Sequence, residues 1–332
     1  MLRVLQVGLG PLGQKVAGDL IARELGTVVA AVDPAAEIVG QPLSELVPGA
    51  GEGEVLSVVE EVPADEPIDA AVVTTLSDLD AIMPTMRALL DRGYTVVSTC
   101  EELAWPWLRH PIHAQELGER AVRNGGRVLG TGVNPGFLMD AFPVAAATAC
   151  HSVSSVRVTR LQDASPRRVP FQRKIGAGLD DAGFAARRAD GSLRHVGLGE
   201  SLHLVGHYLG LRFDRWDEEL EPVQAERELE CALGTIPAGH AAGVRQVARG
   251  WTGDRLTAEL IFQAAIGQEN PHDRVEIEGE PPVDLVWRGG MHGDTATSAI
   301  VLNSIRALRA AAPGLHTMAT LPMQGCVRRG GR

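Results

Sequence analysis

The amino-acid sequence predicts an α/β protein in which an N-terminal doubly wound parallel sheet is followed by an α+β domain. Over the first 135 residues, short β-branched runs alternate with segments of helical periodicity, as they do in βαβ units. A glycine-rich turn directly follows the first of these runs, at residues 8–13. After Pro135 the strand-like stretches become longer, which is typical of a separate α+β domain. A chain of 332 residues is long enough for two such domains.

The periodicity places the elements of the parallel sheet in order along the chain. Strands are expected at residues 3–7, 28–32, 70–75, 95–98 and 127–130. The helices between them are expected at residues 12–25, 79–91 and 114–124. In the second half, residues 200–211 form one clear helix, and residues 294–312 form another that ends before Pro313. We expect this last helix to return to the first domain.

Composition limits the partners that the chain can bind. The chain has 31 Lys and Arg residues against 42 Asp and Glu residues, a net charge of −11. Such a charge disfavours nucleic acid and anionic membranes, so a small molecule is the expected partner. The sequence contains no long apolar signal or spanning run, which predicts a cytoplasmic protein. The four cysteines are widely scattered without a CxxC pair, so we expect reduced thiols and no structural zinc.

The glycine-rich turn has the pattern G-L-G-P-L-G between an apolar strand and a helix, where a dinucleotide-binding fingerprint occurs. The first glycine permits the tight turn, the second lets a pyrophosphate approach the backbone, and the third lets helix and strand pack closely. The N-terminus of the helix attracts the phosphates, and a proline suits its first turn. The sequence therefore predicts a Rossmann domain whose dinucleotide contacts include Gly8, Gly10, Pro11, Leu12 and Gly13.

Asp33 predicts which dinucleotide is bound. It stands 20 residues after Gly13, at the end of the second strand, where a carboxylate accepts hydrogen bonds from the adenosine ribose. A carboxylate there repels a 2′-phosphate, and no Lys or Arg follows before the next turn. NAD is therefore favoured, and NADP stays possible. A flavin is the other occupant that such a turn can hold, but no second glycine-rich flavin motif is present.

The residues that follow three further strands are the next candidates, because ligands of doubly wound sheets bind at the carboxyl ends of the strands. The expected cofactor contacts there are Thr74, Thr75, Leu76, Ser77, Cys100, Asn134 and Pro135. Two carboxylates, Glu101 and Glu102, lie in the same region and are the catalytic candidates. A second interpretation makes both of them acids of a first helical turn, which the helix dipole favours without any function.

Several longer motifs together resemble one family. They are STCEELAWP at residues 98–106, GTGVNPGFLMD at 130–140, QDASPRRVPFQRKIGAG at 162–178, GGMHGDTATSAIVLNSI at 289–305 and the closing PGLHTMATLP. With the glycine turn, these motifs resemble the 2,4-diaminopentanoate dehydrogenase-like proteins. That group includes the native amine dehydrogenases and is similar in fold to dihydrodipicolinate reductase. The resemblance spans nearly the whole chain.

The resemblance implies an architecture and an activity. Residues 1–138 would form the NAD(P)-binding Rossmann domain, residues 139–290 an α+β substrate and dimerisation domain, and residues 291–332 the returning helix. The activity implied is NAD(P)-dependent interconversion of an amine and a ketone or aldehyde with ammonia, in a homodimer. A carboxylate of the CEEL stretch would be catalytic, with Glu101 preferred to Glu102 because it is closer to the strand end. Asn303 is a candidate contact of the nicotinamide amide by resemblance alone.

The implied chemistry needs a carboxylate and no metal. Ammonia is mostly protonated at neutral pH, so a carboxylate beside the nicotinamide can hold ammonium, remove its proton and later protonate the departing hydroxyl. Two histidines, His203 and His207, have the helical spacing of zinc ligands. Leu204 stands where an HExxH motif has glutamate, so we interpret these histidines as structural.

The expected substrate pocket combines apolar residues with a cation and a histidine. Its candidates are Phe137, Leu138, Met139, Phe142, Arg168, Phe171, Leu179 and His292. Each apolar member can equally be plain core. Arg168, with Arg167 and Lys174 nearby, bears on the substrate, because only a substrate with a carboxylate needs a cation. Two alternatives therefore stay open: a diamino acid dehydrogenase acting on a carboxylate-bearing chain, and a non-catalytic NAD-binding sensor.

Overall fold

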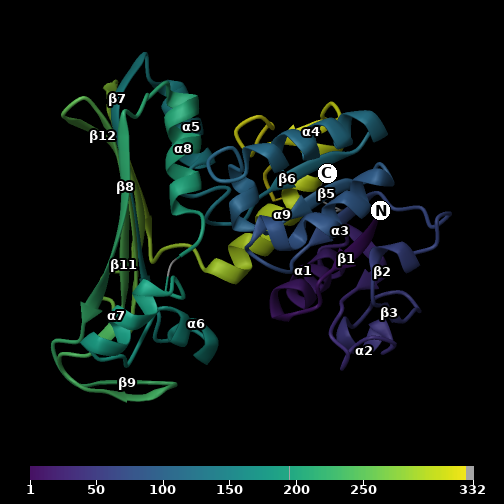
Figure 1. Ribbon diagram of the computed structural model, residues 1–332, viewed down its shortest axis with the longest axis horizontal. Helices are drawn as coiled ribbons and strands as arrows, with labels where there is room; N and C mark the ends of the chain where they lie inside the picture. The colour runs from purple at the N-terminus through teal and green to yellow at the C-terminus, as the bar shows by residue number, and fades with distance from the viewer. Residues whose placement is uncertain (194, 327–332) are drawn as a thin grey trace. The chain divides into compact units, whose positions relative to one another are not determined.

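The chain folds into two units, each built on its own β-sheet (Figure 1). The computed structural model describes residues 1–193 and 195–326. One unit comprises Met1–Leu138 and the segment that begins at His292, and the other comprises Met139–Met291. The first sheet is wholly parallel and the second is mixed, so the predicted fold class is confirmed. Within the described residues, no helix combines the length and the apolar character that a membrane span requires.

The first unit has a seven-stranded parallel sheet in the order β15-β6-β5-β4-β1-β2-β3. Its strands are β1 (Leu2–Val7), β2 (Gly26–Val32), β3 (Val55–Leu56), β4 (Ala70–Val73), β5 (Thr95–Ser98), β6 (Arg127–Gly130) and β15 (Gly314–His316). The chain adds β2 and β3 on one side of β1 and then returns to add β4, β5 and β6 on the other. The order therefore reverses between β1 and β4, which is where a doubly wound sheet binds its ligand.

Helices cover both faces of this sheet. They are α1 (Pro11–Ala22), α3 (Leu79–Asp91), α4 (Pro111–Asn124) and α9 (Gly293–Ala310), with the shorter α2 (Leu43–Leu46), η1 (Val59–Glu61) and η2 (Glu101–Ala104). Helix α1 packs on α9, and α3 packs on α4. Because both faces are covered, the central strands are buried throughout, and Val72, Val73, Val96 and Val97 are all 0% exposed. Such strands read as continuous apolar runs in the sequence.

Helix α9 crosses the sheet from the carboxyl ends of the strands to their amino ends. Near its start, the Thr297 hydroxyl accepts a hydrogen bond of 3.1 Å from the backbone N–H of Val133, which follows β6. Near its end, Arg309 donates a hydrogen bond of 2.6 Å to Asp69, which precedes β4. Only the first turns of α9 therefore lie near the carboxyl ends of the strands, where a ligand is expected.

The second unit has a six-stranded mixed sheet in the order β14-β13-β7-β12-β11-β8. Its strands are β7 (Ser152–Asp163), β8 (Arg215–Gln224), β11 (Ala241–Thr252), β12 (Arg255–Ala265), β13 (His272–Glu280) and β14 (Val283–Arg288). A separate ribbon pairs β9 (Leu229–Cys231) with β10 (Gly234–Ile236). The helices are α5 (Ala141–Ala146), η3 (Ala147–Ala149), α6 (Val169–Lys174), α7 (Asp181–Ala189) and α8 (Leu198–Leu209). Helix α8 packs on β11 and β12 and covers the centre of the sheet.

A buried ion pair fixes the end of the second unit. Arg160 on β7 and Asp273 on β13 are 2% and 1% exposed, with 3.9 Å between Nη1 and Oδ2. Burial lowers the pKa of Arg160 and raises the pKa of Asp273, because each charge has left water. Both side chains also bind Met291: Arg160 Nη2 donates to its carbonyl at 2.9 Å, and Asp273 Oδ2 accepts from its N–H at 2.7 Å. The pair therefore anchors the backbone directly before α9.

Substituting Asp273 with Ala is expected to destabilise the second unit by about 3–5 kcal/mol, because the Arg160 charge would stay buried without its partner. Equilibrium unfolding in urea measures this change. The matched control is Glu278→Ala, because the ion pair of Glu278 with Arg255 is exposed (72% and 59%). That control is expected to cost less than about 1 kcal/mol. Equal losses in the two variants would contradict the anchoring role.

Candidate active site

The glycine turn after β1 brings backbone atoms closer together than any side chain permits. Gly8 has φ +90°, and a Cβ built on it would lie 2.8 Å from the Thr74 carbonyl oxygen. A Cβ on Gly13 would lie only 2.0 Å from the Gly8 carbonyl oxygen. At Gly10, by contrast, no atom of another described part of the chain lies within 4 Å of the Cβ position. Two glycines are thus required by packing, and the third leaves open space beside the backbone.

The N-terminus of α1 opens onto that space. Gly10 is the N-cap residue, no side chain caps the helix, and its first turn holds no acid. Pro11 occupies the first helical position, where its missing N–H costs nothing. The first N–H groups and the positive end of the helix dipole attract an anion at this point. The turn therefore fits the pyrophosphate of a dinucleotide.

Asp33 lies beside the glycine turn. Its Oδ2 accepts a hydrogen bond of 2.7 Å from the Leu9 N–H, and its Oδ1 accepts one of 2.9 Å from the Ala35 N–H. An ionised carboxylate offers about four lone-pair sites. Two are thus used by the backbone, and the others are available to a pair of ribose hydroxyls.

Gln6 and Thr74 hold the glycine turn in place by hydrogen bonds to the Gly8 carbonyl. Gln6 is 0% exposed, and its Nε2 donates to the Gly8 carbonyl at 2.9 Å and to the Thr74 hydroxyl at 2.8 Å. The Thr74 hydroxyl in turn donates to the Gly8 carbonyl at 2.9 Å. The side chain of Thr74, a predicted cofactor contact, is therefore committed to the protein. Gln6 was not predicted, although a polar residue between the apolar Leu5 and Val7 was the available signal.

The residues that follow β4 and β5 are joined by hydrogen bonds. The Cys100 thiol donates to the Ser77 carbonyl at 3.1 Å, and its backbone N–H donates to the Ser98 hydroxyl at 3.1 Å. Burial raises the pKa of the Cys100 thiol to about 12, so the group stays protonated at neutral pH and is no nucleophile. Thr75 and Leu76 are exposed at the same edge.

The two candidate carboxylates have different surroundings. Glu102 Oε2 accepts a hydrogen bond of 2.9 Å from the Leu79 N–H, at the start of α3, and lies 2.9 Å from His110 Nε2. Glu101 is half-buried, and within the described part of the chain no hydrogen bond or ion pair engages its carboxylate. Glu102 is therefore held in place by its neighbours, whereas Glu101 is available to a ligand.

The loop after β6 is buried and is joined to the residues at the carboxyl end of the neighbouring strand. Residues 131–136 are all buried, and the Asn134–Pro135 peptide bond is cis. The Thr131 N–H donates to the Ser98 carbonyl at 2.8 Å, just as the Thr99 N–H donates to Val73 and the Thr74 N–H to Val7. These bonds join the ends of β1, β4, β5 and β6 in one row. The structure thus brings together the predicted residues of the glycine turn, Asp33, residues 74–77, residues 100–102 and residues 134–135.

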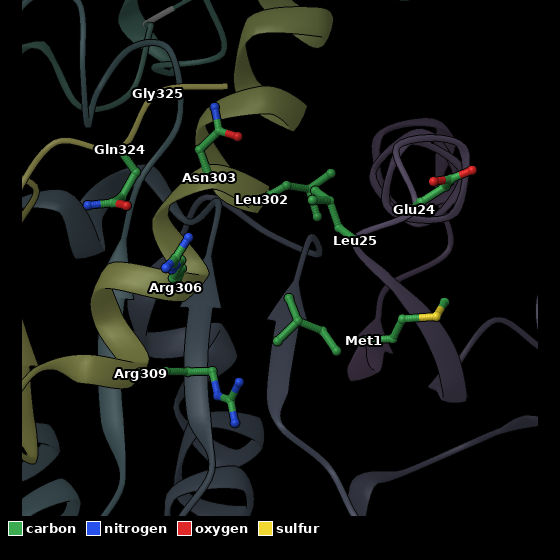
Figure 2. Close-up of a pocket in the computed structure, with 10 residues that line it drawn as sticks. Met1, Glu24, Leu25, Leu302, Asn303, Arg306, Arg309, Gln324 and Gly325 are labelled. Carbon is green, nitrogen blue, oxygen red and sulfur yellow. The ribbon is translucent and has the colours of Figure 1, made fainter. Parts of the chain in front are cut away.

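Asn303 does not lie in this row. Its Oδ1 accepts a hydrogen bond of 2.6 Å from Arg23, which follows the C-terminus of α1. Asn303 lines a cavity of about 360 Å³ with Met1 and Leu25 at the amino end of β1 (Figure 2). Helix α1 has 12 residues and so separates this place from the glycine turn by about 18 Å. The structure therefore gives no support to Asn303 as a nicotinamide contact; Thr297, six residues earlier on α9, is nearer the carboxyl ends of the strands.

The C-terminal part of the chain identifies its family. A model of the 2,4-diaminopentanoate dehydrogenase C-terminal domain matches residues 137–330, more than half of the chain. The chain belongs to this family. The resemblance predicted from the motifs is thereby confirmed. This dehydrogenase is an NAD(P)-dependent oxidoreductase by family, and its substrate is a separate question.

Three known proteins illustrate the relationship. The 2,4-diaminopentanoate dehydrogenase of Acetoanaerobium sticklandii is 27% identical over 331 residues, which cover 97% of this chain and 94% of that protein. The structure of an amine dehydrogenase from Mycobacterium smegmatis has a TM-score of 0.84 at 23% identity and covers 99% of this chain and 98% of that one. A dipicolinate-bound dihydrodipicolinate reductase from Paenisporosarcina sp. TG-14 has a TM-score of 0.52 at 16% identity, with coverage of 95% and 97%. The last two show a shared fold.

The predicted substrate residues of this dehydrogenase are divided between its units. Phe137, Leu138 and His292 belong to the first unit, and Met139, Phe142, Arg168, Phe171 and Leu179 belong to the second. Leu138 and Met139 are 1% and 0% exposed, which fits the alternative that they are core. His292 is exposed and is the N-cap residue of α9. Leu179 lines a groove of about 330 Å³ with Arg173 and Arg187.

Arg168 and Phe171 lie together on α6. Arg168 is exposed as the N-cap residue, and the Arg167 guanidinium lies 4.2 Å from the centre of the Phe171 ring. The 0% exposed Gln172 holds the preceding loop, because its Nε2 donates to the carbonyls of Ala164, Ser165 and Arg167 at 3.1 Å each. Gln172 was not predicted, and its only signal in the sequence is its position inside the PFQRK motif.

Two glycine substitutions separate packing from ligand binding. Gly10→Ala is expected to melt at the wild-type temperature but to raise the Kd for NADH at least about tenfold, because its methyl group fills the phosphate space. Gly13→Ala is expected to destabilise the fold itself, because its methyl group would overlap the Gly8 carbonyl. Thermal melts and NADH fluorescence titrations measure the two effects. Wild-type NADH affinity in Gly10→Ala would contradict the placement of the pyrophosphate.

Proposed function

We propose that this chain is an NAD-dependent amine dehydrogenase, which interconverts small aliphatic ketones or aldehydes and ammonia with the corresponding amines. The observation that carries the proposal is the Glu101 carboxylate, which lies unengaged at the carboxyl ends of the strands, next to the anchored Glu102. It shares this edge with the glycine turn and Asp33. Membership of the 2,4-diaminopentanoate dehydrogenase family supports chemistry at a carbon that bears nitrogen.

The cofactor is proposed to be NAD. Gly8, Gly10 and Gly13 with the N-terminus of α1 would hold the pyrophosphate, and Asp33 would accept hydrogen bonds from the adenosine ribose. The carboxylate of Asp33 would repel the 2′-phosphate of NADP, so NADP is the weaker ligand. When bound, NAD supplies the hydride acceptor or donor at its nicotinamide ring.

Glu101 is proposed to be the acid and base of the reaction. As an anion it holds ammonium and removes one proton, which releases ammonia to attack the carbonyl carbon of the substrate. It then returns the proton to the hydroxyl of the carbinolamine, so that water leaves and an iminium cation forms on the substrate. The same carboxylate, again negative, stabilises this cation while its carbon accepts hydride. Deamination follows the same steps in reverse.

Glu102 is proposed to be a positioning residue. Its contacts with the Leu79 N–H and with His110 Nε2 fix the first turn of η2 against α3 and α4. The backbone of Glu101 is therefore held by its neighbour, and its side chain needs no partner of its own. A carboxylate held this way keeps its place at the edge while staying open to ammonium.

Replacing Glu101 with Gln is expected to lower amination turnover by about 10²–10⁴-fold, because Gln neither takes nor returns a proton. The Kd for NADH is expected to stay unchanged in this variant. Glu102→Gln is the matched control and is expected to lose less turnover but to melt at a lower temperature, because one anchoring group is weakened. Initial rates, NADH titration and thermal melts measure these effects. A larger loss of turnover in Glu102→Gln than in Glu101→Gln would reverse the two roles.

A second candidate function is oxidation of a diamino acid that carries a carboxylate. It is favoured by Arg168, an exposed cation at the start of α6, and by the relationship with 2,4-diaminopentanoate dehydrogenase. A carboxylate-bearing substrate would form a charge-assisted hydrogen bond with such a guanidinium, whereas a simple ketone would not.

Arg168→Ala distinguishes the two candidates. Under the first, KM for a simple ketone is expected to change by less than about twofold. Under the second, KM for the diamino acid is expected to rise at least about tenfold, because a hydrogen bond to a charged group contributes about 1.5–3 kcal/mol. Arg173→Ala, which removes an exposed cation from the same helix, is the control. Steady-state kinetics with both substrates measures the change.

A further inference from the structure

A cluster of two histidines and one aspartate lies behind Glu102, in the first unit. Asp80 is in the first turn of α3, His110 is the N-cap residue of α4, and His113 is in the first turn of α4. His113 Nε2 lies 2.7 Å from Asp80 Oδ1, and His110 Nδ1 lies 3.5 Å from the same oxygen. One ligand atom of each residue lies within 4.8 Å of the other two.

The two distances from Asp80 Oδ1 are close to those between the ligands of a small divalent cation. Zinc binds nitrogen and oxygen ligands at about 2.0–2.2 Å, so two of its tetrahedral ligands lie about 3.4 Å apart. The observed separations lie on either side of that value. Small side-chain rotations therefore suffice to form the site. The exposed Asp80, 67% accessible, leaves room for water at the remaining coordination positions.

Each histidine also has a carboxylate on its other side. His110 turns Nδ1 toward Asp80 and Nε2 toward Glu102 Oε2, at 2.9 Å. His113 turns Nε2 toward Asp80 and Nδ1 toward Glu116 Oε2, at 3.9 Å. Glu102 is within hydrogen-bond distance of His110, as is the carboxylate that commonly orients a metal-binding histidine and fixes the position of its proton. Glu116 lies beyond hydrogen-bond distance of His113.

The Nδ1 atom of His113 supplies a separate observation. It is buried, and no hydrogen-bond partner for it is present among the described residues. If Nε2 holds a metal, the proton of the neutral ring resides on Nδ1 and faces the Glu116 carboxylate. The two rings are stacked, with an interplanar angle of 12° and centres 5.9 Å apart.

The local charge favours a cation. Arg87 and Arg120 bind Glu116 at 2.6 Å and 3.4 Å and neutralise it. Asp80 and Glu102 then contribute negative charge around the two imidazoles. The positive ends of α3 and α4 oppose a cation, and the Asp78 cap of α3 and the carboxylates of Asp80 and Glu102 offset that charge.

We propose that Asp80, His110 and His113 form a binding site for one divalent cation of the zinc type, which joins the N-termini of α3 and α4. The two imidazoles favour Zn²⁺ over Mg²⁺ and Ca²⁺, which prefer oxygen ligands. The site is distinct from the glycine turn and from Glu101, and it needs no dehydrogenase chemistry. Because Glu102 binds His110, a bound metal would also restrict the movement of Glu102 and so of η2.

The test uses the full chain without a polyhistidine tag, after treatment with EDTA and dialysis. Calorimetric titration with ZnCl₂ is expected to give one equivalent bound, and Co²⁺ is expected to show the visible absorption of a nitrogen-ligated, low-coordinate site. Asp80→Asn and His113→Ala are each expected to weaken Zn²⁺ binding at least about tenfold, because the first replaces an anionic ligand by a neutral amide oxygen and the second removes an imidazole ligand. His151→Ala, which removes an exposed histidine of the second unit, is the matched control and is expected to bind as wild type does.

Thermal melts give a second readout that does not depend on turnover. Zn²⁺ is expected to raise the Tm of wild type and His151→Ala but not that of Asp80→Asn or His113→Ala, since a ligand stabilises only a fold that binds it. Lack of stoichiometric Zn²⁺ binding by wild type would overturn the proposal. Binding that is equally strong in Asp80→Asn and His113→Ala would also overturn it.

Discussion

The rest of the candidate site depends on the contact between Gly13 and the Gly8 carbonyl. A Cβ at position 13 would lie 2.0 Å from that oxygen, so α1 can lie this close to β1 only because the residue is glycine. The approach brings the uncapped N-terminus of α1 to the carboxyl edge of the sheet, beside Asp33. Gln6 and Thr74 then secure the Gly8 carbonyl from below. Without this contact the edge would lack both its anion site and its alignment with β4.

The polar groups at this edge divide into those that hold the protein together and those that stay available. Cys100 and Ser77 join β5 to β4, and Glu102 joins η2 to α3 and α4. The side chains of Cys100 and Glu102 thus form hydrogen bonds with other groups of the protein. Glu101, between Cys100 and Glu102, has none in the described residues. A catalytic acid and base needs this combination, because its backbone must be rigid while its carboxylate exchanges protons.

The sequence predicted the features that depend on local pattern. Strands such as 95–98 and 127–130 agree with β5 and β6, because buried parallel strands are short apolar runs. Asp33 was found because it follows a strand at a fixed distance from Gly13. Contacts between distant segments left no such pattern. The partnership of Glu102 with His110, and of Asp80 with His113, arises only when α3 and α4 pack side by side. Asn303 was named by resemblance alone, and the structure places its side chain beside Arg23 at the amino end of β1.

We propose that Glu101, an unengaged carboxylate at the carboxyl ends of the strands, is the acid and base for the replacement of oxygen by nitrogen at a substrate carbon. The most direct test is the rate of NADH oxidation with small aliphatic ketones and aldehydes, measured with and without ammonium at fixed ionic strength. If the chain is an NAD-dependent amine dehydrogenase, oxidation requires ammonium, runs faster with NADH than with NADPH, and yields the amine. Oxidation at the same rate without ammonium, with an alcohol as product, would contradict it.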